Sequence, residues 1–334
     1  MIEAKTCLIL GAGASAAYGL PTGGQLRDLI LADRAVGAAE TALRFWPESA
    51  RYDAHPQKAR TRAAQQWIDY LKVTTPETDG VNLGEFRARF FEGKVPSIDK
   101  FLQHNMAAFG EVGRIQIAAV LLRCERDQLL DKGWYAELFT QIAPNEPDDL
   151  IPGMLSVITF NYDRSFERFF TQAIRSTFNL SEPETANIFA RINVCHVYGS
   201  LGTLADAPYG MSASYATAAK SIELMRVGGK LTDRVARGAL EKAENVCFIG
   251  FGFAPENVAL FEGIDLKSKR LIATSIGLPK NRMAAAQKAL GEIAFFDGDG
   301  ETLLRETDIF RPQGKAEIES APAVRSSAYA AYLI

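Results

Sequence analysis

The sequence contains few cysteines, and they are far apart. Its 334 residues include four, at Cys7, Cys124, Cys195 and Cys247, with no C-x-x-C spacing. This pattern excludes a zinc knot and a disulfide framework. Cys7, Cys195 and Cys247 lie in apolar segments, where a buried free thiol is expected. We therefore expect a cytoplasmic protein without zinc.

The chain also lacks an excess of positive charge and any long apolar run. Its formal net charge is −3, so no basic surface predicts direct binding to nucleic acid or to an anionic membrane. No apolar run approaches the length that crosses a bilayer, and residues 1–5 lead into a strand rather than a signal peptide. With 47% hydrophobic and 23% charged residues, the composition is typical of a globular protein.

Short apolar segments alternate with helical segments over most of the chain. Several of these segments are continuously apolar, as strands covered on both faces should be. The predicted strands are Thr6–Leu10, Leu155–Phe160, Ile192–Val197, Asn245–Gly250, Arg270–Ser275 and Glu292–Phe296. Alternation of strand and helix predicts an α/β fold with a Rossmann-like, doubly wound parallel sheet of about six strands.

One long segment breaks this alternation. Residues 36–147 show helical spacing, for example over 111–130, but no convincing strand. We interpret them as a helical insertion between the first and second strands, acting either as a lid or as an oligomerisation layer. Residues 1–35 and 148–312 would then form the nucleotide-binding core, and residues 313–334 a C-terminal tail.

A glycine-rich loop follows the first predicted strand. It reads Gly11-Ala12-Gly13-Ala14-Ser15, followed by Gly19-Leu20-Pro21-Thr22-Gly23-Gly24. Such a loop lets backbone N–H groups approach a diphosphate. The G-x-G-x-x-G pattern would need glycine at Ala16, and no Lys-Ser/Thr pair follows, which excludes a P-loop. Asp33 lies in a predicted helix, away from the strand end that holds a ribose-binding acid. A tight turn that binds nothing is the alternative.

Polar residues follow the second predicted strand, in the run Thr159-Phe160-Asn161-Tyr162-Asp163. In an open parallel sheet, ligands bind outside the carboxyl ends of the strands. Asn161 and Asp163 are therefore placed to meet a ligand held by the glycine loop. Alternatively, either residue could cap the next helix, since Asn and Asp are preferred N-caps.

The third predicted strand ends at one of only three histidines. His196 precedes Tyr198-Gly199-Ser200, whereas His55 and His104 lie in the helical insertion with no partner pattern. An imidazole at a strand end beside a phosphate loop would suit a general base. A hydrogen-bonded core histidine is the alternative.

The fourth predicted strand ends in Gly250-Phe251-Gly252-Phe253, followed by Glu256 and Asn257. Here too the glycines allow close backbone approach. Glu256 and Asn257 could bind ribose hydroxyls, or could simply occupy the first turn of a helix.

Taken in order, these motifs resemble the sirtuin family, and most closely its divergent bacterial branch. Phe160 stands where sirtuins have Gln, and Val197-Tyr198 are inserted into the family's His-Gly pair. The matching segments are Gly11–Ser15 with Gly19-Leu20-Pro21, Thr159–Asp163, His196 with Gly199-Ser200, Gly250–Phe253 with Pro255-Glu256-Asn257, and Ser97–Leu102.

The resemblance implies NAD as substrate. It implies that Asn161 and His196 are catalytic, with Asn161 near the nicotinamide ribose and His196 as general base. The NAD-binding set that it implies is Gly11, Ala12, Gly13, Ser15, Pro21, Thr159, Asp163, Gly199, Gly250, Gly252, Glu256 and Asn257. Within that set, Asp163 would hold the nicotinamide and Asn257 the far ribose.

Sirtuin deacylases carry a four-cysteine zinc ribbon after the His motif, but here only Cys247 follows Cys195. This departure argues against peptide deacylation and favours hydrolysis of NAD⁺ to nicotinamide and ADP-ribose. Bacterial relatives of this kind deplete NAD⁺ in anti-phage defence, often as oligomers. The resemblance therefore predicts a homo-oligomer, and it allows for an activating protein or nucleotide signal.

Three other functions stay open. A deacylase or ADP-ribosyltransferase would use the same first step. A dehydrogenase would share the phosphate loop but leave the glycosidic bond intact. A non-catalytic NAD or ADP-ribose sensor, or a scaffold subunit, would bind without turnover.

Overall fold

The computed structural model describes residues 2–35, 37–74, 82–210, 215–224, 231 and 233–312. The predicted tail at 313–334 lies outside these residues. In the described part of the chain, no helix is long and apolar enough to cross a membrane.

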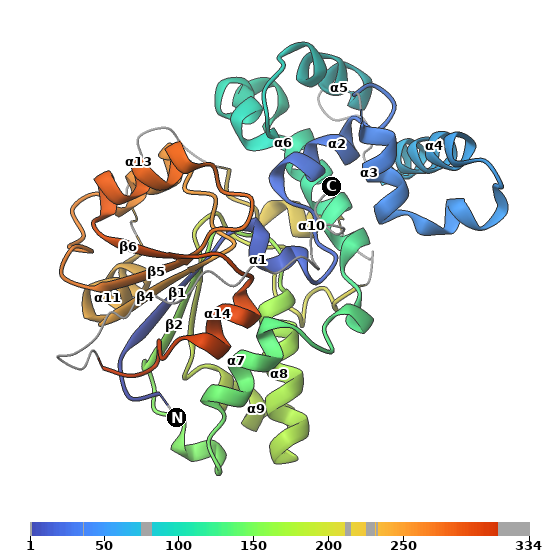
Figure 1. The fold of residues 1–334 in the computed structure, drawn as a ribbon. Helices are drawn as coiled ribbons and strands as arrows, with labels where there is room; N and C mark the ends of the chain where they lie inside the picture. The colour runs from blue at the N-terminus through green and yellow to red at the C-terminus, as the bar shows by residue number, and fades with distance from the viewer. Residues whose placement is uncertain are drawn as a thin grey trace.

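The centre of the molecule is a parallel sheet of six strands (Figure 1). Its order is β3-β2-β1-β4-β5-β6, so the sheet extends in both directions from β1, and the predicted doubly wound α/β fold is confirmed. The strands are β1 (Thr6–Leu10), β2 (Leu155–Thr159), β3 (Asn193–His196), β4 (Asn245–Ile249), β5 (Arg270–Thr274) and β6 (Ile293–Phe296). Each lies at its predicted place to within one residue at either end.

Burial explains why these segments form strands. Every residue of β1, β2 and β4 is buried, as expected for central strands covered by helices on both faces. All four residues of β3 are half-buried, because β3 is an edge strand. His196 therefore stands at the last position of a partly open edge.

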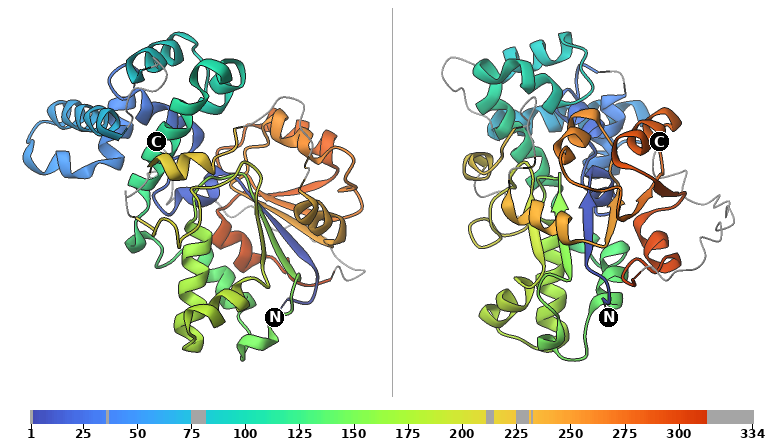
Figure 2. Two further views of the ribbon diagram at one scale, coloured as in Figure 1. Left: turned by 180° about the vertical axis from the view of Figure 1, so that it is seen from behind. Right: turned by 90° about the vertical axis from the view of Figure 1, so that its left-hand side faces the viewer.

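Helices flank both faces of the sheet (Figures 1 and 2). In one layer, α7 packs on both α8 and α14, and α9 packs on α8. Elsewhere, α11 packs on β2 and β3, and α13 packs on β6. Their bounds are α7 (Trp134–Ile142), α8 (Ser165–Phe178), α9 (Glu182–Phe189), α11 (Arg234–Lys242), α13 (Lys280–Leu290) and α14 (Gly300–Glu306). The strand order reverses at β1, and the general preference for right-handed crossovers then places the connections on the two sides of β1 on opposite faces.

A second body of helices stands at one end of the sheet (Figure 1). We call α2–α6 with α10 the helical group. Its bounds are α2 (Gly23–Ile30), α3 (Ala38–Phe45), α4 (Pro56–Thr74), α5 (Leu83–Glu92), α6 (Ile98–Cys124) and α10 (Tyr215–Lys220). The short helices α1 (Ala12–Ala16) and α12 (Pro255–Val258) follow β1 and β4. Short 3₁₀ turns cover Pro47–Tyr52, Asp127–Leu129, Pro147–Asp149 and Ala259–Phe261.

The helical group packs around aromatic side chains of its own. One set contains Trp46, Trp67, Tyr70 and Tyr215, and the other contains Phe86, Phe90, Phe101 and Phe109. The helix predicted over 111–130 ends at Cys124, so its predicted end was wrong. The helix ends there because the backbone of Glu125 is extended. The buried carboxylate of Glu125 pairs with Arg164 at 2.8 Å.

The helical group does not coincide in sequence with residues 36–147. The helix α2, which precedes position 36, packs on α3 and α6, whereas α7 packs on α8 and α14 beside the sheet. Trp134 at the start of α7 donates its indole N–H to the carbonyl of Ala14 in α1, 2.8 Å away. The chain thus returns to the sheet before β2 begins.

Candidate active site

The polar motifs predicted from the sequence follow the carboxyl ends of β1, β2, β3 and β4. These strands are neighbours in register, with Leu10 opposite Thr159 and Thr159 opposite His196. The start of α6 reaches this edge from the helical group, where Asp99 accepts a hydrogen bond of 2.8 Å from the hydroxyl of Tyr162. The loops after the strands therefore meet in one place, with the helical group beside them.

Asn161 connects the loop after β2 to the glycine loop after β1. Its side-chain amide donates to the carbonyl of Gly11 at 2.9 Å and to the hydroxyl of Ser15 at 3.0 Å. Its backbone N–H donates to the Thr159 hydroxyl at 3.1 Å. Asn161 is only 9% exposed. Four of the residues predicted for the site are thus joined by direct contacts.

Asp163 is bonded to the first turn of α8 and to the glycine loop. Its carboxylate accepts hydrogen bonds from the backbone N–H of Ser165, at 3.1 Å, and from the hydroxyl of the same residue, and it also bonds to the side chain of Ser15. Burial raises the pKa of Asp163, against the opposing effect of these hydrogen bonds. Neither Asn161 nor Asp163 is the N-cap of α8, which is Arg164, and both contact Ser15 of the glycine loop.

His196 has a polar partner at each ring nitrogen. Nδ1 lies 2.9 Å from the backbone carbonyl of Asn161, and Nε2 lies 2.5 Å from Oε1 of Glu167 on α8. Burial lowers the pKa of His196, but the charge of Glu167 and the hydrogen bonds outweigh it, so that the net shift is upward. Of the two interpretations of His196, that of a hydrogen-bonded histidine describes these contacts.

Glu167 is a site residue that sequence reasoning missed. It lies one helical turn after Asp163, in the first turn of the helix that follows β2. The spacing of four residues from Asp163 puts both side chains on the same face of the chain as it enters α8, and this could have drawn attention to Glu167. In the structure, the start of α8 lies beside the end of the neighbouring strand β3. Without the strand order, nothing in the sequence paired Glu167 with His196.

The glycines of the first loop pack against the loop after β4. The N–H of Gly11 donates to Ile249 at 3.1 Å, and that of Gly13 donates to Gly250 at 3.0 Å. A Cβ on Gly250 would stand 2.0 Å from the backbone nitrogen of Ala14, and Gly250 has φ +59°. Loop-to-loop packing therefore accounts for these glycines without a ligand, and it occupies two of the N–H groups expected to face a phosphate.

Gly252 differs from these glycines. It is exposed, and a Cβ placed on it would meet no atom within 4 Å. The next residue, Phe253, is buried with φ +47°, a left-handed conformation that is uncommon for an aromatic residue. Such strain is concentrated at functional loops in proteins generally.

The remaining predicted residues lie around this loop. Asn257 accepts a 2.7 Å hydrogen bond from Tyr198, and Glu256 pairs with Lys100 of α6 at 3.5 Å. Gly199 has φ +67°, and a Cβ there would stand 2.0 Å from the carbonyl of Ser221. These contacts form a second cluster, next to the one around Asn161.

Two other predicted residues have structural surroundings. Ala12 begins α1 and is half-buried, and Pro21 is buried just before Thr22, the N-cap of α2. Phe160 packs edge-on against Phe251 at 4.9 Å and Tyr198 at 5.7 Å between ring centroids. This aromatic contact joins the segments that follow β2, β3 and β4.

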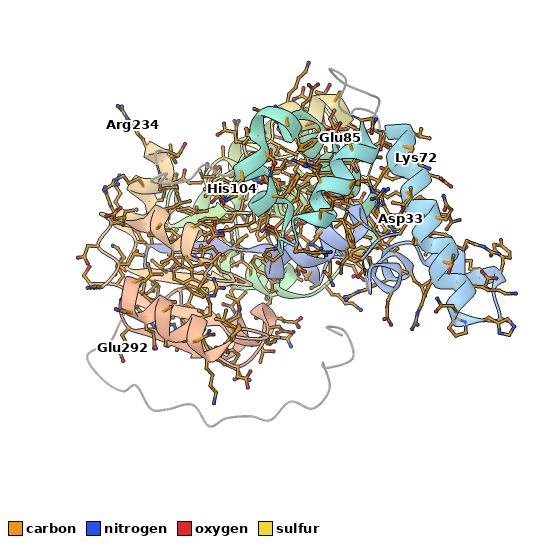
Figure 3. The ribbon with its side chains drawn as sticks, turned by 90° about the horizontal axis from the view of Figure 1, so that it is seen from above. Asp33, Lys72, Glu85, His104, Arg234 and Glu292 are labelled. Carbon is orange, nitrogen blue, oxygen red and sulfur yellow. The ribbon has the colours of Figure 1, made fainter. Side chains whose placement is uncertain are left out.

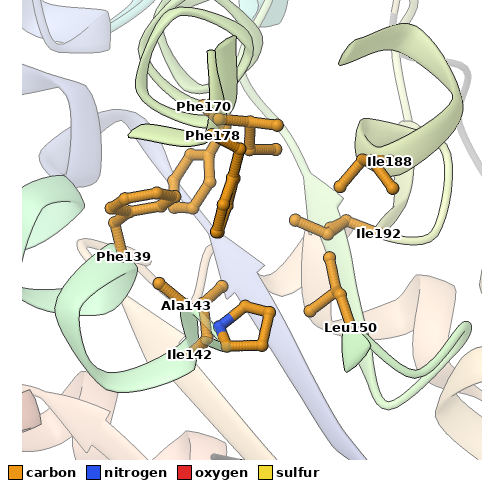
Figure 4. A pocket seen from close by; sticks show the side chains of 10 residues that line it. Phe139, Ile142, Ala143, Leu150, Phe170, Phe178, Ile188 and Ile192 are labelled. Atoms are coloured by element: carbon orange, nitrogen blue, oxygen red, sulfur yellow. The ribbon is translucent and has the colours of Figure 1, made fainter. Parts of the chain in front are cut away.

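Two cavities lie away from these residues. A small apolar one of about 10 Å³ lies between α7, α8 and α9 and is lined by Phe139, Phe170 and Ile192 (Figure 4). A groove of about 360 Å³ runs beside α11 and is lined by Lys5 and Ser156, among others. Neither is lined by Asn161 or His196.

Charged residues elsewhere in the chain do not join the site. Asp33 pairs with Arg87 of α5, so it does not stand at a strand end. Figure 3 shows Asp33, Lys72 and Glu85 at the helical-group end of the molecule. Among the described residues, no group of three or more His, Cys, Asp or Glu side chains is arranged to hold a metal ion.

The chain was compared with protein-family models and with curated proteins. No protein-family model matches the chain, and no curated protein matches it either. The resemblance to sirtuins thus stays a proposal supported by the motifs and their geometry.

Proposed function

We propose that this protein is a sirtuin-like NAD⁺ glycohydrolase, which cleaves NAD⁺ to nicotinamide and ADP-ribose. The observation that supports this most strongly is the convergence of three distant motifs. Asn161 bonds to Gly11 and Ser15 through its side chain and to His196 through its carbonyl. Those residues are the ones that the resemblance assigns to the diphosphate, the nicotinamide ribose and the general base.

Hydrolysis of the bond between nicotinamide and ribose requires a ribose held in place and a base that accepts a proton from water. Water attacks the ribose carbon that bears nicotinamide, the carbon–nitrogen bond breaks, and nicotinamide leaves as a neutral base while the water gives up a proton. His196 is the residue proposed to take that proton. Because its Nδ1 is bonded to the carbonyl of Asn161, Nε2 is the nitrogen that can accept it. Asn161 would orient the ribose hydroxyls or the water.

The buried carboxyl group of Asp163 is proposed to hold the nicotinamide amide. Its carboxylate accepts hydrogen bonds from Ser165, and it can also accept one from the amide N–H of nicotinamide. We also propose cytoplasmic location, a homo-oligomer and NAD⁺ depletion in anti-phage defence, from the resemblance alone.

The test is product analysis after incubation of the purified protein with NAD⁺. We expect equal amounts of nicotinamide and ADP-ribose, and loss of both products in Asn161→Ala. Reduction of NAD⁺ with an intact glycosidic bond would identify a dehydrogenase instead. Nicotinamide release only with an acylated peptide would identify a deacylase. Tight binding of NAD⁺ without release would identify a sensor, and each of these results contradicts the proposal.

A further inference from the structure

Both ring nitrogens of His196 are engaged. The carbonyl of Asn161 can only accept a hydrogen bond, so Nδ1 carries a proton. In a neutral ring with that tautomer, Nε2 has a lone pair. That lone pair would point at a carboxylate oxygen of Glu167 only 2.5 Å away. The contact is attractive only if a proton lies between Nε2 and Oε1.

We propose that Glu167 is a positioning residue that holds His196 as the imidazolium in the ligand-free protein, and that this imidazolium must pass its Nε2 proton to Glu167 or to solvent before His196 can accept a proton from water. The second half of this inference rests on the proposed function, and the first half does not. Glu167 is placed for the role because α8 leaves β2 beside the end of β3, where His196 stands.

The surroundings of Glu167 support the role. Its other oxygen, Oε2, is buried and has no hydrogen-bond partner among the described residues. A buried acceptor without a partner is costly, so an arriving hydroxyl group would gain by bonding to it. A hydrogen bond to Oε2 would also draw negative charge away from Oε1 and so weaken the hold of Glu167 on Nε2.

Charged groups on more than one element act on His196. Glu167 on α8 has the largest electrostatic effect, and Asp163, in the turn between β2 and α8, adds to it. Both favour the imidazolium, in opposition to burial. Removing the charge of Glu167 should therefore lower the pKa of His196.

The test is NMR titration of the histidine ring signals in the full chain. The sequence has only three histidines, and His55 and His104 are exposed and serve as internal references. We expect both nitrogens of His196 to be protonated near neutral pH in the wild type. Glu167→Gln, which keeps the shape, should lower the pKa of His196 by about one unit or more. Wild-type spectra that show a neutral ring would overturn the proposal.

The matched control is Asp127→Asn. Asp127 also pairs with α8, through Arg168 at 2.8 Å, but does not contact His196. We expect it to leave the His196 titration unchanged. If Glu167→Gln fails to fold, Glu167→Asp keeps the charge but shortens the side chain, and it should break the contact with Nε2 and also lower the pKa. An equal titration of His196 in the wild type and a folded Glu167 variant would refute the inference.

Activity separates this inference from the proposed function. If His196 is the base, NAD⁺ cleavage rises with pH as the imidazolium loses its proton, and Glu167→Gln should move that rise to lower pH. If the NMR result holds but the wild type never cleaves NAD⁺, the proposed function is wrong and the pairing of His196 with Glu167 still stands. If the wild type and Glu167→Gln cleave NAD⁺ with the same pH profile, Glu167 does not control the protonation of His196 during the reaction.

Discussion

The sheet and the helical group are built in different ways. The sheet is built on three central strands, β1, β2 and β4, whose residues are all buried, and its six strands pair in parallel. The helical group is held by clusters of aromatic side chains contributed by helices far apart in sequence. The polar contacts between the two regions include Tyr162 with Asp99 and Lys100 with Glu256, and both lie at the candidate site.

The two regions nevertheless share one core. Their buried apolar residues form a single cluster, and Tyr162, which bonds to Asp99 across the junction, is itself buried. The contacts at this junction therefore decide whether one region can lose structure without the other.

The largest expected effect is in the core of the helical group. The ring of Phe101 lies 5.0 Å from that of Phe90 and 5.7 Å from that of Phe109, between centroids. Phe101→Ala should destabilise this region by about 3–5 kcal/mol. In hydrogen exchange, α5 and α6 should lose protection while β1 keeps it. Equal loss of protection in β1 would show that the two regions unfold together.

The next effect concerns the sheet. Gly250→Ala must adopt a left-handed conformation and push against the backbone of Ala14, so we expect a loss of about 2–4 kcal/mol in global unfolding by denaturant. Gly252→Ala is the matched control, because its Cβ meets open space, and should change stability by about 0.5 kcal/mol or less. Similar losses in both variants would contradict the loop packing described above.

The smallest effect on stability concerns the link between the regions. Tyr162→Phe removes the hydrogen bond to Asp99 and should cost about 1 kcal/mol. Protection from exchange should fall in the first turn of α6. Tyr198→Phe is the control. It removes a similarly short hydrogen bond, to Asn257, between two loops at the end of the sheet, and it should leave the protection of α6 unchanged. Unchanged protection of α6 in Tyr162→Phe would mean that other contacts hold the two regions together.

The sheet could be predicted from the sequence because its rules are local. Continuous apolar runs such as Thr6–Leu10 and Asn245–Ile249 are strands covered on both faces, and their alternation with helices predicts a parallel sheet, although not the order of its strands. The helical group could be recognised as helical but not placed. Contacts such as Tyr70 with Tyr215 join residues whose separation no periodicity reveals.

The sequence predicted which strand ends carry the candidate residues, but not how those residues pair. Position after a strand was enough to select Asn161 and His196. The partner of His196 is a helical residue, Glu167, and it depends on which strand lies next to β2. The glycines of the first loop were interpreted as ligand contacts, whereas Gly11 and Gly13 also bond to the loop after β4, which local sequence does not show.

The rate of nicotinamide release tests the central claim most directly. It should be measured for the wild type, for His196→Ala and for His104→Ala, a control on an exposed face of α6 in the helical group. All three proteins should keep their folded circular dichroism spectra. We predict that His104→Ala releases nicotinamide at the wild-type rate and that His196→Ala loses at least about a hundredfold, as expected for removal of a general base. Wild-type rates in His196→Ala would contradict the account.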